Sequence, residues 1–159
     1  MKIVQATTNV DFIECTNPQK NKWRIRWNFI DKEDCITYWE EEFNHQPSWH
    51  EIRDTIFNWI NNTVECKICE GFTWKGMPIW LSSENQFNYK AAYDLALQTS
   101  GESLPVLFKF GTDDQPQYYE FQTIEDFTDF YKKAIRHIQD TLTWGWQEKE
   151  QINPKDYQI

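Results

Sequence analysis

The sequence predicts an α+β fold, in which antiparallel β-hairpins pack with three helices and the C-terminal helix is long. Short segments alternate apolar and polar residues, as strands do, while longer segments repeat apolar residues every three or four positions, as helices do. The length of 159 residues suits one domain, or a small domain with an attached arm. We predict an N-terminal β-hairpin arm or subdomain at 1–46, an α+β module at 47–152 and a tail at 153–159.

The clearest strand is 22–30, KWRIRWNFI, where Trp23, Ile25, Trp27 and Phe29 alternate with polar residues. A polar turn at 31–34 and the segment CITYWEEEF complete an antiparallel hairpin, and residues 1–14 are expected to add a strand. The charged residues of these strands, which include Lys20, Lys22, Arg24, Arg26 and Glu40 to Glu42, are predicted to form solvated faces.

Ser48 and Glu51 have the spacing of a capping box, which predicts a helix over 49–63. Residues 64–70 alternate in polarity and are expected to open a second hairpin, which turns at Lys75 and Gly76. A second capping spacing, at Ser83, predicts a helix over 84–98. Its side facing the core is expected to carry Phe87, Ala91 and Leu95.

A third hairpin is predicted in the segment LPVLFKFGTDDQPQYYEFQ, and Thr123 is expected to cap the long helix that follows. A helix of about 25 residues spans about 37 Å, so the turns around Trp144 and Trp146 are expected to project. The predicted core residues are Trp59, Phe127, Phe130, Ile135 and Ile138. The polar tail is expected to fray or to dock on a partner.

The chain has 25 acidic and 16 basic residues, and its formal net charge of −9 disfavours phosphate backbones and anionic lipids. We therefore expect no nucleic-acid partner. No apolar run is long enough to span a membrane or to serve as a signal peptide, so we expect no membrane partner and synthesis in a cytoplasm. Cys15, Cys35, Cys66 and Cys69 are expected to remain thiols.

The residues of the chain do not form a catalytic motif. Cys66 and Cys69 make a C-x-x-C, but positions three apart on a strand point to opposite faces, and no second pair completes a zinc site. His45, His50 and His137 are expected in surface or capping roles, and five glycines are too few for a phosphate-binding loop. We expect no metal, no cofactor and no enzymatic activity, although paired carboxylates across a cleft leave a glycosidase formally open.

The aromatic content is high, with 9 Trp, 7 Tyr and 11 Phe. One core absorbs part of this surplus, and the remainder favours a binding surface, because aromatic residues are enriched at interface hot spots. The predicted partner-binding residues are Trp23, Trp27, Trp39, Trp144 and Trp146. Exposed tryptophans also stack on sugar rings, so carbohydrate binding stays open as an alternative from another class.

The segment from Ile68 to Lys90 resembles a domain of unknown function found in phage genomes. That family shows a hairpin with the pattern G-aromatic-x-aromatic-x-G and then S-x-E-x-Q-x-N at the start of a helix. A short hairpin and a long helix introduced by Thr follow. The resemblance covers about residues 48–150. It extends to modules encoded near tail-fibre and virion genes, including those of crAss-like phages, and distantly to tail-fibre assembly proteins.

The resemblance implies a component of the virion and no catalytic residues. We expect an adaptor or attachment protein for head or tail fibres, which binds capsid, fibre or tail proteins and forms a homodimer. A tail-fibre assembly chaperone is the first alternative. A carbohydrate-binding host-recognition module that uses Trp23 and Trp27 is the second.

Overall fold

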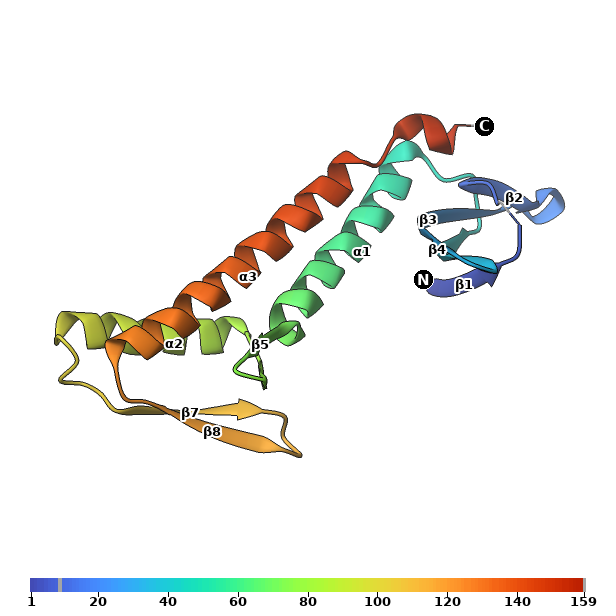
Figure 1. Cartoon of the computed structure of the whole chain (residues 1–159). Helices are drawn as coiled ribbons and strands as arrows, with labels where there is room; N and C mark the ends of the chain where they lie inside the picture. The colour runs from blue at the N-terminus through green and yellow to red at the C-terminus, as the bar shows by residue number, and fades with distance from the viewer. Residues whose placement is uncertain (9, 159) are drawn as a thin grey trace. The chain divides into compact units, whose positions relative to one another are not determined.

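A computed structural model describes residues 1–8 and 10–158 and confirms the α+β fold (Figure 1). The chain divides into two compact units. Unit 1 comprises residues 1–60 and 148–159, and unit 2 comprises residues 61–147. The predicted boundaries at 46 and 152 differ from this division, because the first part of the predicted module and the tail both belong with the N-terminal sheet.

Eight strands, three α-helices and two 3-10 turns make up the described chain. The strands are β1 (Lys2–Ala6), β2 (Ile13–Asn17), β3 (Lys22–Lys32), β4 (Cys35–Phe43), β5 (Phe72–Trp74), β6 (Met77–Ile79), β7 (Val106–Gly111) and β8 (Pro116–Phe121). The helices are α1 (Trp49–Glu70), α2 (Ser83–Gln98) and α3 (Ile124–Glu150), and the 3-10 turns are η1 (Pro18–Lys20) and η2 (Pro154–Tyr157). No helix in the described residues combines the length and apolar character that a membrane crossing requires.

Unit 1 is built on an antiparallel sheet in the order β1-β4-β3-β2, and this sheet contains the predicted N-terminal hairpin. Trp27 pairs with Trp39, but Ile30 pairs with Thr37, so β3 carries one extra residue between these pairs. Asn28 takes a left-handed conformation within this bulge, with φ of 54°. The bulge reverses the alternation that the sequence predicts. Phe29 therefore leaves the face of Trp27 and packs against Tyr38 on the other side.

The start of α1 and the C-terminal turn complete unit 1. The capping box is confirmed: the Ser48 backbone N–H and hydroxyl both donate to Glu51, at 2.8 Å each. Within the C-terminal tail, the turn η2 is docked on the sheet of unit 1, because the buried Tyr157 hydroxyl donates to the Arg26 carbonyl at 2.9 Å. The prediction that the tail frays or docks on a partner is therefore wrong for Pro154–Tyr157, which docks on the sheet of the same chain.

Residues 64–70 are helical and belong to α1, so the predicted strand in this segment is wrong. Val64 and Ile68 follow Ile60 at steps of four, and Ile68 packs against the core of unit 2, so the apolar spacing continues the helix. The helix ends before Gly71, whose N–H donates to the Lys67 carbonyl. A Cβ at Gly71 would lie 2.5 Å from that carbonyl oxygen, so a larger residue does not fit this close approach.

The helix α2 is present, but its N-cap is Ser82 and not Ser83: the Ser82 hydroxyl accepts a hydrogen bond from the Asn85 N–H at 3.2 Å. The face predicted for the core is exposed. Phe87 is 71% exposed, and Ala91 and Leu95 are also at the surface. The opposite face is buried through Tyr89 and Ala96. Both faces carry apolar residues at helical spacing, so periodicity alone does not choose between them.

The hairpins β5–β6 and β7–β8 and the helix α3 supply most of the core of unit 2, where ten buried residues form one cluster. Phe127 and Phe130 are fully buried, as predicted, and Ile138 packs against the cluster. Ile135 is 36% exposed, so its assignment to the core is wrong. It follows buried Ala134 directly, and the helix turns it toward solvent.

Candidate functional site

The tryptophans of the N-terminal hairpin divide between the core and the surface of unit 1. Trp27 is 1% exposed, and its ring centroid lies 6.2 Å from that of Trp59 on α1. Its prediction as a partner-binding residue is therefore wrong. Trp59 is buried, so its predicted place in the core is confirmed. In the sequence, Trp27 alternates with polar residues in the same way as Trp23. Trp27 is buried because α1 packs on it through Trp59, and the alternation does not show this contact.

Trp23 and Trp39 are both half-buried. The Trp23 indole N–H donates to the Asn21 side chain at 2.8 Å, which holds the ring next to the turn before β3. The centroid of the Trp39 ring lies 5.7 Å from that of the Trp59 ring, and Trp39 also lines a surface groove. Partner contact through these two residues remains a prediction. The burial of Trp27 removes one of the two rings on which the sugar-binding alternative was based.

The two tryptophans predicted near the end of α3 belong to unit 2. The Lys67 ammonium lies 3.3 Å from the centroid of the Trp144 ring, in cation–π contact. Trp146 is 57% exposed, and no ring contact or hydrogen bond of its side chain occurs within the described residues. Trp146 is thus available to a partner, while one face of Trp144 is already covered.

A groove of about 240 Å³ runs beside β1 on unit 1, and we call it the β1 groove. It is lined by Ile3, Gln5, Asn28, Ile30, Lys32, Thr37, Tyr38 and Trp39. Ile3 is 62% and Ile30 is 49% exposed, although both are large and apolar. Ile30 reaches this face because the bulge in β3 places it opposite Thr37.

The strand β1 is at the edge of its sheet, so one side of its backbone pairs with no strand in the described part of the chain. Unpaired edge strands offer N–H and C=O groups to another chain, and proteins usually protect them with charges, proline or bulges. The opposite edge, β2, has such protection: its register is interrupted after Cys15, and Glu14 is ion-paired with Arg26. The edge strand β1 has no interruption of register; it carries one charged residue, Lys2, which is ion-paired with Glu40, and an exposed isoleucine at position 3.

The charged residues of the sheet are not all solvated, which corrects the sequence prediction. Arg26 and Glu40 are buried, and Glu40 lies within 4 Å of the cationic groups of Lys2, Arg24 and Arg26. The hydrogen bond from Arg24 holds the pKa of the Glu42 carboxyl below its usual value. Neither Arg26 nor Glu40 lines any of the described cavities, so we interpret this network as structural.

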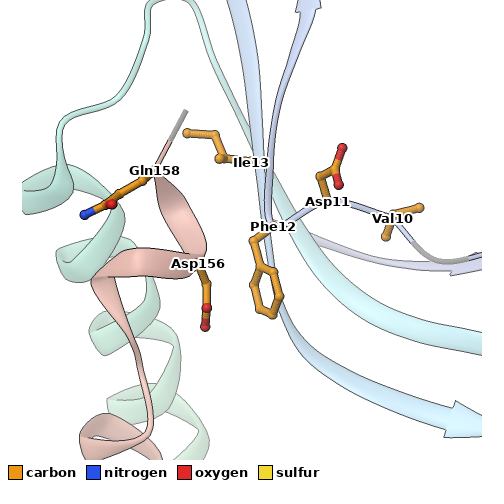
Figure 2. A pocket seen from close by; sticks show the side chains of 6 residues that line it. All are labelled: Val10, Asp11, Phe12, Ile13, Asp156 and Gln158. Carbon is orange, nitrogen blue, oxygen red and sulfur yellow. The ribbon is translucent and has the colours of Figure 1, made fainter.

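A second cavity in unit 1, of about 410 Å³, is lined by residues at the start of β2 and in the C-terminal turn. Figure 2 shows Asp156 and Gln158 on one side and residues 10–13 on the other. Asp11 and Asp156 give this cavity an acidic lining, while Phe12 and Ile13 are apolar. Such a lining suits a cation better than an anion, and it agrees in sign with the net charge of the chain.

The cysteines are free thiols, and each histidine is hydrogen-bonded or ion-paired with a neighbouring group. Cys66 and Cys69 lie on α1, and burial raises the pKa of the Cys69 thiol, which disfavours its reactive thiolate form. Within residues 1–8 and 10–158, no three His, Cys, Asp or Glu side chains are placed to hold a metal ion. His137 is hydrogen-bonded to the Lys67 carbonyl at 3.0 Å, and His45 is hydrogen-bonded to Glu51 at 2.8 Å.

No protein-family model, no curated protein and no solved structure matches the chain.

Proposed function

We propose that this chain is a bacteriophage virion protein that acts as an adaptor and binds other proteins through the edge of its N-terminal sheet. The observation that carries the protein-binding part is the exposed edge of β1 beside the apolar β1 groove. The assignment to a phage particle is supported by the sequence resemblance of residues 48–150 to phage modules.

The geometry favours strand addition as the mode of binding. In this mode an extended segment of the partner pairs with an open sheet edge, and pockets beside the edge take its alternate side chains. The β1 strand offers such an edge, and Ile3, Ile30 and Trp39 offer an apolar pocket beside it. The partner would be a capsid, fibre or tail protein, and we propose that the adaptor itself is a homodimer.

The first experiment asks whether the protein stays in the particle. We expect mass spectrometry of purified virions to detect the chain, and we expect chemical cross-links from Lys2 or Lys32 to another virion protein. Presence during assembly but absence from finished particles would contradict the adaptor and favour a tail-fibre assembly chaperone. Sedimentation of the purified chain tests the homodimer.

A second experiment tests the surface itself. Ile3→Asp places a charge at the sheet edge, which natural proteins use to prevent strand pairing. We expect this variant to fold, because Ile3 is mostly exposed, and to be lost from virions. Leu107→Asp is the matched control, since Leu107 is an exposed apolar residue on β7 of unit 2 and should leave incorporation unchanged. Equal incorporation of both variants would rule out binding through β1.

A further inference from the structure

Trp80 is placed differently from the tryptophans of the core. It follows β6 directly and is 49% exposed. In the described part of the chain its ring contacts no other aromatic ring, and its indole N–H donates no hydrogen bond. Trp74, six residues earlier, is buried among four aromatic rings, and its indole N–H donates to Asp129 at 3.0 Å. The core therefore does not need the Trp80 ring.

Trp80 forms part of the wall of a cavity of about 550 Å³ within unit 2. The cavity is also lined by Asn85, Lys109, Phe110, Gly111, Thr112 and Asp113. Phe110 is buried and gives an apolar base, while the other side chains supply both donors and acceptors. This volume is within the range typical of small-molecule sites, about 300–1,000 Å³.

Hydrogen bonds hold the segment that carries Trp80. The Leu81 N–H donates to the Cys69 carbonyl at 2.9 Å, and the Gln86 side chain donates to the Leu81 carbonyl at 2.7 Å. The Asn85 side-chain amide donates to the carbonyl of Trp80 itself at 2.9 Å. The backbone under the exposed indole is therefore fixed before any ligand arrives, which lowers the entropic cost of binding.

The opposite wall is a tight turn between β7 and β8. Gly111 has a φ of +80°, and a Cβ there would lie 2.4 Å from the Gln115 carbonyl oxygen, so this turn requires glycine. The Gln115 N–H donates to both the carbonyl and the hydroxyl of Thr112. Both walls are thus ordered by hydrogen bonds that involve the backbone.

We infer that this cavity binds a neutral sugar ring of a glycan, stacked on the indole of Trp80. Sugar rings present an apolar face of C–H groups and a rim of hydroxyls, which match an exposed indole surrounded by polar side chains. The Lys109 ammonium lies 3.2 Å from Asp113, so the two charges of the cavity compensate each other. The net charge of −9 disfavours acidic polysaccharides.

This site differs from the proposed protein-binding surface in its residues and in its unit. A partner strand would use β1 of unit 1, whereas the sugar would use Trp80 of unit 2. Its residues also differ from Trp23 and Trp27, the residues of the sugar-binding alternative predicted from the sequence. The signal that could have identified Trp80 is its place between a strand and a helix cap, outside any apolar stripe.

The test uses the purified chain of 159 residues on an array of neutral and acidic bacterial surface glycans. Titration calorimetry then measures the dissociation constant of the strongest neutral glycan. We expect Trp80→Ala to weaken binding by at least about tenfold, because stacking is lost. Trp80→Phe should retain part of the affinity, because an aromatic face remains.

Trp146→Ala is the matched control, since Trp146 is 57% exposed, against 49% for Trp80, but does not line the cavity. It should bind the glycan as tightly as the wild type, and Ile3→Asp should do the same. The inference is overturned if no neutral glycan binds, or if Trp80→Ala binds as tightly as the wild type. It is also overturned if Trp146→Ala loses as much affinity as Trp80→Ala. Circular dichroism confirms that each variant is folded.

Discussion

Replacing Phe130 by alanine should destabilise unit 2 more than replacing Ile135, although the sequence places both residues in the core. Phe130 is fully buried. The centroid of its ring lies within 5.4 Å of the ring centroids of Trp74, Tyr89, Phe110 and Phe121. Truncating a buried phenylalanine lowers the free energy of unfolding by about 3–5 kcal/mol. The lost aromatic contacts place this variant at the upper end, at about 5 kcal/mol.

Urea unfolding followed by tryptophan fluorescence measures this change, because Trp74 lies 5.3 Å from Phe130. With a slope of about 2 kcal/mol per molar urea, the midpoint should fall by about 2.5 M. Ile135→Ala removes a partly exposed side chain and should cost about 1 kcal/mol or less. If the two variants unfold at the same urea concentration, the burial described for α3 is incorrect.

Three further changes test other parts of the fold. Hydrogen bonds from Ser48 and His45 lower the pKa of the Glu51 carboxyl from its ordinary value of 4.5 to about 2. The ionised carboxylate therefore stabilises the folded chain above pH 4.5, and this stabilisation is lost as the pH falls toward 2. The difference in melting temperature between wild type and Glu51→Gln should therefore shrink over that interval, and a constant difference would contradict the cap. Tyr157→Phe leaves the Arg26 carbonyl without its donor and should cost about 1–3 kcal/mol in thermal unfolding, whereas a frayed tail would give no change. Gly111→Ala should lower the free energy of unfolding of unit 2 by more than about 1 kcal/mol. Gly76 also has a positive φ, but no atom lies within 4 Å of a Cβ built there, so Gly76→Ala should cost less. Equal losses for the two variants would mean that the close contact at Gly111 is relieved.

The start of the long helix α3 and most of its buried side could be predicted from the sequence, because their signals are local. A threonine cap, two acids in the first turn and apolar residues at steps of three and four mark its start and its buried side. Ile135 is the exception, since the apolar stripe is wider than the surface that the rest of unit 2 covers. The width of the α3 surface that the rest of unit 2 buries cannot be predicted from the sequence of α3 alone.

The extent of α1 was harder to predict because two periodicities overlap there. Val64, Cys66 and Ile68 alternate with polar residues, which favours a strand, while Ile60, Val64 and Ile68 also keep the four-residue step of a helix. The helix prevails because its last turns pack against the core of unit 2. Local propensity alone therefore gave the wrong answer for this segment.

For the candidate binding surface, sequence identified one relevant residue and missed the geometry. Trp39 was predicted and lines the β1 groove, but the exposure of Ile30 depends on a bulge that a strict alternation does not reveal. Trp27 was misassigned because a strand has two faces, and sequence does not say which face a helix will cover. Trp80 was not predicted as a binding residue, because it belongs to no periodic pattern.

The division of the chain into units has a consequence for how the protein is made. Unit 2 lies wholly between residues 61 and 147, whereas unit 1 needs residues from both ends of the chain. Synthesis runs from the N-terminus, so the ribosome releases every residue of unit 2 before the last residues of unit 1. During that interval the N-terminal sheet lacks Tyr157, whose hydroxyl binds the Arg26 carbonyl. The part of the chain that is translated first is therefore the part that is completed last.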